Sequence, residues 1–350
     1  MPGKTSIQWT DYSTNPFKAR RPDGKLFNYC AKISAGCANC YAATLTHRWS
    51  GPDYTAKAGA DLKPVLVEAE LQKLLRFKPR EPWRMGRPVC RESKPMVFAH
   101  DMTDAFLDFW PDSFLDRFFA VVALRPDVIF QVLTKRPERM LGYFSMPSRY
   151  GGIAIAAQGL GAKEMTTAWP LPNLHLGVSV ENQKHADERI PLLLQTPAAV
   201  RFVSYEPALG PVELGKWLYR RCDECDSPMP CERHTRIGGS QMYGESAQLN
   251  WIILGGESGP GARPCDVAWI RSAVEQCKAA GVACFVKQLG SCASDPENGL
   301  AGAALRVHPD GAALISRRLR DSKGGDIDEF PDDLKVREFP RLTPAPAVVE

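Results

Sequence analysis

Residues 97–136 read VFAHDMTDAFLDFWPDSFLDRFFAVVALRPDVIFQVLTKR. Apolar residues fill positions 97–99 and all of positions 129–133 except Gln131, and short runs of this kind are typical of buried strands. Between the two runs, apolar residues recur at the spacing of a helix that starts after Pro111. A strand, a helix and a second strand in this order predict parallel pairing, because parallel strands need a long crossover connection.

The same alternation continues toward the C-terminus. Further strand-like runs are Leu174–Val180, Arg201–Tyr205, Trp251–Leu254 and Ala283–Lys287. Further helical patterns cover Val65–Phe77, the region of Ile190–Leu194, and Trp269–Cys277, which Gly281 ends. We therefore expect an α/β protein, a partial (β/α) TIM-like barrel of about six parallel strands with an N-terminal three-cysteine loop and an inserted Cys-rich module.

Two segments interrupt the alternation. Residues 145–172 are rich in Gly, Ala and Pro and suggest a loop insertion, and residues 216–248 are rich in Cys, Arg and Gly and suggest an inserted module. The chain then divides into four parts. These are the cysteine loop with the first part of the barrel (1–215), the inserted module (216–248), the last barrel units (249–295), and a C-terminal extension and tail (296–350).

The composition directs attention to cysteine. The chain has 350 residues, 44% of them hydrophobic, which excludes wholesale disorder, and its net charge of +4 permits a nucleic-acid partner. We see no apolar run of the roughly 18 residues that a membrane span needs, and no secretory signal, so we expect a cytoplasmic protein. Thiols stay reduced there, and 11 cysteines cannot all pair, so some should be metal ligands.

Cys30, Cys37 and Cys40 follow the pattern C-x6-C-x2-C in one loop ahead of the barrel units. Three thiolates in one loop suit an iron–sulfur cluster or zinc. A cluster with three protein ligands leaves one iron open to a substrate or cofactor. The alternative is a zinc loop whose fourth ligand lies elsewhere, such as Cys90 or His47.

A second group, Cys222, Cys225, Cys231 and His234, has four zinc-type ligands in thirteen residues. Nearby arginines suit phosphate contacts, while a solvated insertion with spare cysteines or an auxiliary iron–sulfur cluster are the alternatives. Cys277 and Cys284 lie in apolar patterns and are expected in the core. No role is assigned to Cys90, Cys265 and Cys292.

Polar residues end each of the six predicted strands, where parallel α/β folds carry their chemistry. They are His100, Asp101, Asp104, Lys135, Arg136, Ser179, Glu181, Glu206, Glu257 and Lys287. One acidic residue after a strand is usually a helix cap, but six such strand ends predict a polar mouth. Gly255-Gly256 would let backbone N–H groups approach a ligand, although the full dinucleotide-binding fingerprint is absent.

A three-cysteine loop followed by a parallel barrel resembles the radical S-adenosylmethionine (SAM) superfamily. Residues 100–104 (HDMTD) and 133–136 (LTKR) resemble its spore photoproduct lyase-like branch. The whole chain is similar to a phage-associated family of radical-SAM-like proteins with an N-terminal three-cysteine motif. The matching segments are Ile7–Asp11, Asn15-Pro16, Gly36–Ala42, Leu133–Met140, Gly177–Asn182, Phe202–Pro211, Trp251–Pro264, Phe285–Gly290 and Phe330–Pro340.

The resemblance implies that Cys30, Cys37 and Cys40 hold a [4Fe–4S] cluster whose open iron binds SAM, and that reductive cleavage yields a 5′-deoxyadenosyl radical. The superfamily's usual spacing is C-x3-C-x2-C, and Asn39 stands where an aromatic residue normally precedes the last cysteine. A further implied partner is a reductant protein, and a partner protein encoded nearby is also expected.

By position, His100, Asp101 and Asp104 would line the amino-group site of SAM, with Ser179 and Glu181 near the ribose or substrate. Substrate-side candidates are Lys135, Glu206 and Glu257, with Arg136 and Lys287. Lys135 is preferred, because a cation at a strand end suits a phosphate or carboxylate.

We therefore expect a radical-SAM-like enzyme that modifies or repairs a nucleic acid or nucleotide. One rival is a zinc-dependent nucleic-acid-binding protein on a degenerate barrel. The other is a barrel glycoside hydrolase that uses Glu181, Glu206 and Glu257, since two facing carboxylates suffice for that chemistry.

Overall fold

The computed structural model describes residues 2–50, 61–78, 94–163, 165, 168–219, 248–295, 303–307, 313–317 and 319–340. Contacts divide the chain into two compact units. Unit 1 comprises Met1–Ser179 and Thr196–Val200, and unit 2 comprises Val180–Gln195 and Arg201–Arg341. Each unit is a mixture of helices and strands, so the expected α/β class is confirmed.

Unit 1 has a mostly parallel sheet in the order β1-β2-β6-β7-β8. Its strands are β1 (Gly3–Lys4), β2 (Tyr12–Thr14), β6 (Met96–Ala99), β7 (Ile129–Thr134) and β8 (Leu174–Val180). Only the pairing of β1 with β2 is antiparallel among these strands. The strands from β6 to β8 are almost entirely buried, as expected for a parallel sheet covered on both faces.

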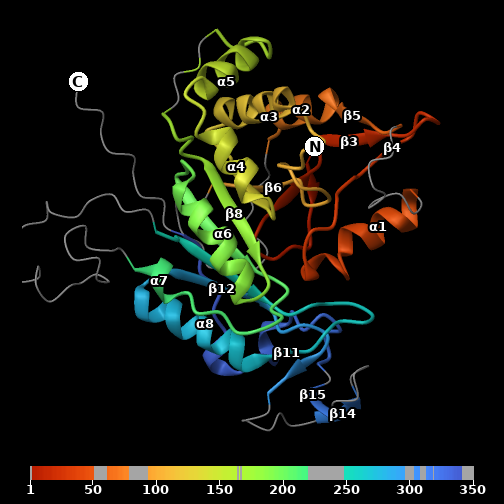
Figure 1. Ribbon diagram of the computed structural model, residues 1–350, viewed down its shortest axis with the longest axis vertical. Coiled ribbons are helices and arrows are strands. Elements are labelled where there is room, and N and C mark those ends of the chain that lie inside the picture. The colour runs from red at the N-terminus through yellow and green to blue at the C-terminus, as the bar shows by residue number, and fades with distance from the viewer. Residues whose placement is uncertain are drawn as a thin grey trace, which may run out of the picture. The chain divides into compact units, whose positions relative to one another are not determined.

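The helices of unit 1 are α1 (Tyr41–Ser50), α2 (Glu68–Leu75), α3 (Asp112–Leu124), α4 (Pro137–Phe144) and α5 (Arg149–Gln158). Helix α3 begins directly after Pro111, as predicted, and packs against α2 and α5 (Figure 1). A small antiparallel sheet in the order β4-β3-β5 holds β3 (Phe17–Arg20), β4 (Leu26–Phe27) and β5 (Lys63–Leu66).

Unit 2 has three parallel strands in the order β9-β10-β12. They are β9 (Val200–Tyr205), β10 (Trp251–Gly255) and β12 (Ala283–Gln288), and the helices are α6 (Gln183–Gln195), α7 (Gly215–Leu218) and α8 (Val267–Ala280). Helix α8 ends at Gly281, which adopts φ 66° as the left-handed cap that the sequence predicted. A further sheet in the order β11-β13-β15-β14 holds β11 (Cys265–Asp266), β13 (Ala293–Ser294), β14 (Ala303–Val307) and β15 (Ala313–Arg317).

Two predicted elements differ in the structure. The expected helix Val65–Phe77 is confirmed over Glu68–Leu75, but its first residues belong to a strand over Lys63–Leu66, because Val65 and Leu66 pair with β3. Residues 145–172, expected as a loop insertion, contain α5. Its Ile153 and Ala157 are buried four residues apart, so packing outweighs the poor helix propensity of the Gly151-Gly152 pair.

The sequence also missed β2, which pairs in parallel with β6. Its three residues are too short for a periodic signal. Among the described helices, none combines the length and the apolar character needed to cross a membrane.

Candidate functional site

The cysteine loop of unit 1 joins the small sheet to α1. Cys30, Cys37 and Cys40 are half-buried free thiols, and a 3-10 turn over Ala35–Cys37 shapes the loop between them. Cys30 and Cys40 pack against Met102, which follows β6. Cys37 and Cys40 both act electrostatically on Cys30, so the loop brings the three thiols into one neighbourhood.

Burial, followed by the charge of Asp104, raises the pKa of the Cys30 thiol to about 12. The Arg136 guanidinium opposes this shift and lies within hydrogen-bonding reach of the Cys30 sulfur. The thiol is therefore protonated at neutral pH until a cation arrives to replace the proton. Metal ions do this when they bind cysteine.

The donor set fits an iron–sulfur cluster in its chemistry. In the described part of the chain, no group of three or more His, Cys, Asp and Glu side chains is arranged to hold a metal ion. A [4Fe–4S] cluster makes a different demand, because each thiolate binds its own iron and the sulfurs need not converge on one point. Three thiols in one loop supply the type and number of protein ligands for such a cluster.

Asp104 and Arg136 form the support behind the loop. The Asp104 carboxylate accepts hydrogen bonds from Thr134 Oγ1 (2.7 Å), the Phe106 N–H (2.9 Å), the Lys135 N–H (3.0 Å) and Arg136 Nη1 (2.9 Å). Both carboxylate oxygens are thus engaged by protein donors. Arg136 then extends Nη2 to the carbonyl of the residue after Cys30, at 2.8 Å.

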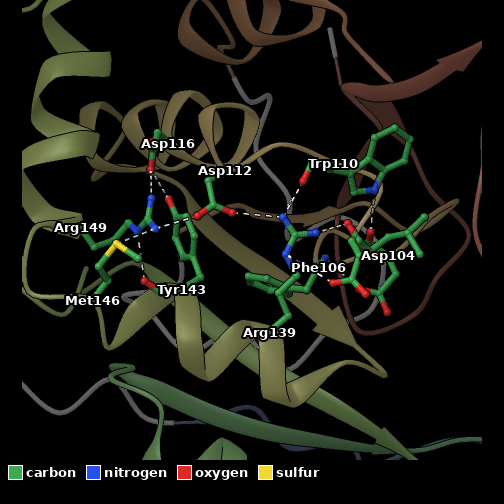
Figure 2. Close-up of polar contacts among 11 residues, drawn as sticks. Asp104, Phe106, Trp110, Asp112, Asp116, Arg139, Tyr143, Met146 and Arg149 are labelled. Atoms are coloured by element: carbon green, nitrogen blue, oxygen red, sulfur yellow. Dashed lines mark hydrogen bonds and ion pairs between the residues drawn. The ribbon is translucent and has the colours of Figure 1, made fainter. Parts of the chain in front are cut away.

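Figure 2 shows how the segment after Asp104 is fixed. The Trp110 indole donates to the Asp104 carbonyl at 2.9 Å, and Arg139 of α4 binds the Trp110 carbonyl together with the Asp112 carboxylate of α3. On the other side of Asp112, the buried Arg149 completes a chain of ion pairs between α3 and α5. The support for Arg136 therefore belongs to a cross-linked part of unit 1.

Two further strand-end residues lie at the end of β6. His100 is buried with φ 65°, and its two ring nitrogens have no hydrogen-bond partner. Burial lowers the pKa of His100 to about 3, so the ring is neutral. Asp101 accepts a hydrogen bond from Asn15 Nδ2 at 2.6 Å, and burial raises its pKa. The Tyr41 hydroxyl donates to the Asp101 carbonyl at 2.6 Å, which ties the residue after Cys40 to this strand end.

Lys135 follows β7, where its N–H is held by Asp104, and Ser179 is buried within β8. Both therefore lie in unit 1 with the cysteine loop. Sequence reasoning missed Asn15 and Tyr41 as site residues. Tyr41 could have been noticed as an aromatic residue next to Cys40, whereas nothing in its own segment predicts that Asn15 contacts Asp101.

In unit 2, the Glu181 side chain is fully buried and forms ion pairs with residues of α6, the helix that follows it. Arg189 Nη1 lies 3.0 Å and His185 Nδ1 2.9 Å from its carboxylate, both from α6. Glu257 forms a paired contact with Arg263, whose Nη2 and Nε lie 2.6 and 2.9 Å from the two oxygens. Neither carboxylate is placed as an isolated acid or base.

Glu206 forms a smaller cluster with Ser204 of β9, the strand it follows, and with Lys287 of β12. Lys287 Nζ lies 3.0 Å from Glu206 Oε1, and the Ser204 hydroxyl donates to Oε2 at 3.1 Å. A Cβ at Gly255 would lie 2.6 Å from Glu206 Oε1, and one at Gly256 would lie 2.2 Å from a backbone oxygen of the neighbouring strand end. The two glycines are thus required by packing within unit 2.

A family model described as a protein of unknown function (DUF5131) matches residues 4–330. The chain belongs to this family. Neither the curated proteins nor the solved structures provide a match.

Within this DUF5131 chain, the second cysteine group (Cys222, Cys225, Cys231 and His234) and Cys90 lie outside the described residues. Cys277 and Cys284 are buried, as predicted for core thiols. Cys265 and Cys292 are also buried, and the Cys265 N–H donates to the Cys292 carbonyl at 2.9 Å. Burial raises the pKa of Cys265 to about 12.

Proposed function

We propose that this chain is an iron–sulfur enzyme of the radical-SAM type, built on a partial TIM-like barrel. The observation that carries the proposal is the cysteine loop. Cys30 and Cys40 pack against the cluster of Ala42 and Met102, Cys37 and Cys40 both act electrostatically on Cys30, and Arg136 reaches both the Cys30 sulfur and the carbonyl of Ala31. Arg136 opposes the rise in the pKa of the Cys30 thiol, and the deprotonated thiolate is the form that binds iron.

Cys30, Cys37 and Cys40 would hold a [4Fe–4S] cluster, which when bound supplies the electron that cleaves SAM to a 5′-deoxyadenosyl radical. The protein groups have separate tasks. Arg136 balances negative charge at the buried Cys30, and Asp104 fixes the position of Arg136.

Asp101 is the residue we assign to the amino group of SAM. The carboxylate of Asp104 already has four protein donors, whereas Asp101 has a pKa raised by burial and gains from a nearby ammonium group. The uncharged His100 borders Asp101 in the chain, and Ser179 supplies a hydroxyl for the ribose. Lys135 would contact a phosphate of the substrate.

The proposed substrate is a nucleic acid or nucleotide. The support is chemical: a lysine and an arginine follow β7 directly, and the sequence places several arginines around the second cysteine group. Glu206 and Lys287 of unit 2 stay candidates for substrate contacts, since their ion pair joins two strand ends. A reductant protein would supply the electron.

The test is anaerobic purification followed by iron, sulfide and zinc analysis, and then incubation with SAM and dithionite. We expect a brown protein that contains iron and sulfide and releases 5′-deoxyadenosine. Cys37→Ala should lose iron and product together, whereas the control Cys277→Ala, which changes a buried core thiol of α8, should retain both. A colourless, iron-free protein would refute the proposal.

The same measurement separates the two rival functions. Zinc without iron, combined with salt-sensitive binding of DNA or RNA, would support a zinc-dependent nucleic-acid-binding protein. A glycoside hydrolase would lose activity in Glu206→Gln and keep it in Cys37→Ala. The arginine contacts of Glu181 and Glu257 favour the iron–sulfur enzyme over the hydrolase, because each carboxylate would have to leave its guanidinium partner to act as a proton donor or nucleophile.

A further inference from the structure

The segment that carries the cysteine loop is unusually basic. Residues 12–50 hold six Lys or Arg and a single acidic residue, Asp23, so this segment alone exceeds the net charge of +4 of the whole chain. Arg20, Lys25, Lys32 and Arg48 are exposed. A cluster of this sign on one short segment attracts polyanions.

The same segment exposes apolar and aromatic side chains. Among the described residues, six large hydrophobic side chains are exposed, and four of them lie here: Leu26 (42%), Ile33 (49%), Tyr41 (48%) and Trp49 (72%). These apolar side chains alternate along the segment with the exposed cations, which is the composition of a surface that binds a partner both apolar and charged. We call the members on helix α1 and in the loop before it, namely Lys32, Ile33, Tyr41, Arg48 and Trp49, the aromatic–basic surface.

Helix α1 places the aromatic and basic groups together. Tyr41 and Arg48 are seven residues apart and share one helix face, and Trp49 adjoins Arg48. The helix lies apart from the layer formed by α2, α3 and α5 (Figure 1). The Tyr41 hydroxyl is anchored on Asp101 while its ring is half-exposed, so the ring is held in place and open to a flat partner.

We infer that the aromatic–basic surface binds single-stranded nucleic acid. Exposed rings offer stacking to unpaired bases, which a duplex keeps stacked inside, and the surrounding cations match the phosphates. A membrane fits less well, because exposed Lys32, Asn39, Thr44 and His47 separate the apolar side chains instead of leaving a continuous apolar face.

The surface also has a defined position relative to the proposed chemistry. Ile33 lies between Cys30 and Cys37, and Tyr41 follows Cys40. A strand bound here therefore presents a nucleotide to the cysteine loop. This last step rests on the proposed function, whereas binding itself does not.

The test uses the full chain and a fluorescein-labelled oligothymidylate of about 20 nucleotides, which exceeds the roughly 4–16 nucleotides that one binding fold covers. Anisotropy is measured between about 50 and 200 mM salt. We expect a single strand to bind more tightly than a duplex of the same length. Trp49→Ala should weaken binding about 5- to 100-fold through the loss of one stacked base.

Arg48→Ala should weaken binding and reduce the slope of log affinity against log salt by about 0.7, the value for one phosphate contact on a single strand. The matched controls are Ile155→Ala, an equally exposed helical side chain in unit 1, and Lys163→Ala, an exposed cation. Both should bind like the unaltered protein.

Equal affinity in Trp49→Ala, Arg48→Ala and the controls would overturn the inference, as would binding to vesicles with anionic lipid in the absence of oligonucleotide binding. Failure of the proposed function gives a different result. A protein without iron that still loses oligonucleotide affinity in Trp49→Ala would refute the radical-SAM chemistry and retain the surface. If the protein releases 5′-deoxyadenosine and Trp49→Ala keeps its oligonucleotide affinity, the radical-SAM chemistry is supported and the nucleic-acid-binding surface is refuted.

Discussion

The ion pair between Asp104 and Arg136 should be a principal support of unit 1. Its atoms lie 2.9 Å apart, and the side chains are only 7% and 12% exposed. Removing one partner from a buried pair leaves the other charged and unpaired, which costs about 3–5 kcal/mol. We therefore expect Arg136→Met and Asp104→Asn each to lower the free energy of unfolding by that amount, measured by urea denaturation of the iron-free protein.

The double variant tests whether the pair itself is responsible. Asp104→Asn combined with Arg136→Met leaves no buried charge, so its cost should fall short of the sum of the single costs by about 0.5–3 kcal/mol. Glu68→Gln is the control, because the Arg117–Glu68 pair has a shorter distance of 2.7 Å but a half-exposed carboxylate. That change should cost about 0–1 kcal/mol.

A second measurement connects the pair to the cysteine loop. Arg136 holds the carbonyl of Ala31 and contacts the Cys30 sulfur, so Arg136→Met should also retain less iron after gel filtration than Glu68→Gln. Single variants that cost less than about 1 kcal/mol, or costs that add without coupling, would refute the reasoning about stability. Unchanged iron content would refute the connection to the loop.

Three further predictions concern stability. Burial lowers the pKa of His175 to about 3, so as the pH falls the unfolded chain binds a proton before the folded chain does. The stability that this residue contributes is therefore present above pH 6.5, and the free energy of unfolding should fall by about 2 kcal/mol between pH 7 and pH 5. Urea titrations at both pH values should show that His175→Leu removes this loss. Gly256→Ala should reduce the thermal midpoint strongly, because the new Cβ would lie 2.2 Å from a backbone oxygen, whereas Gly142→Ala in α4 has open space and should gain about 0.5–1 kcal/mol. Glu181→Gln should cost about 3–5 kcal/mol in chemical denaturation, because it removes the charge that balances the buried Arg189, and an unchanged midpoint would contradict that role.

The elements that could be predicted from the sequence are those whose apolar residues form a continuous run or recur at helical spacing. The run Leu174–Val180 was predicted and is β8, since every one of its seven residues is buried. Helix α8 was predicted because its apolar spacing and Gly281 agree. Strand β2 could not be predicted, because three residues carry no period and its partner, β6, lies more than eighty residues away.

The candidate site also has one part that the sequence could predict and one part that it could not. The spacing of the cysteines is a local pattern, so the loop could be predicted from the sequence. The engagement of Asp104 is not local, because three of its four donors lie at the end of β7, about thirty residues later. The ion pair of Glu181 has a local signal in the sequence, because its partner Arg189 lies in α6, the helix that begins two residues after Glu181. That short separation could have been used to predict the pair.

The charged residues at the strand ends differ in whether protein groups already form hydrogen bonds and ion pairs with them. Asp104 and Glu257 each have several donors within 3.0 Å, so adding a ligand would first require breaking those contacts. Cys30 is in the opposite position, because its buried thiol keeps a proton that iron would replace at a site already provided with a cation. Binding a metal at Cys30 replaces that proton, whereas binding a ligand at Asp104 or Glu257 first breaks contacts with protein donors. This difference in free energy is why the cysteine loop, and not the acidic strand ends, is the place where we expect the chemistry.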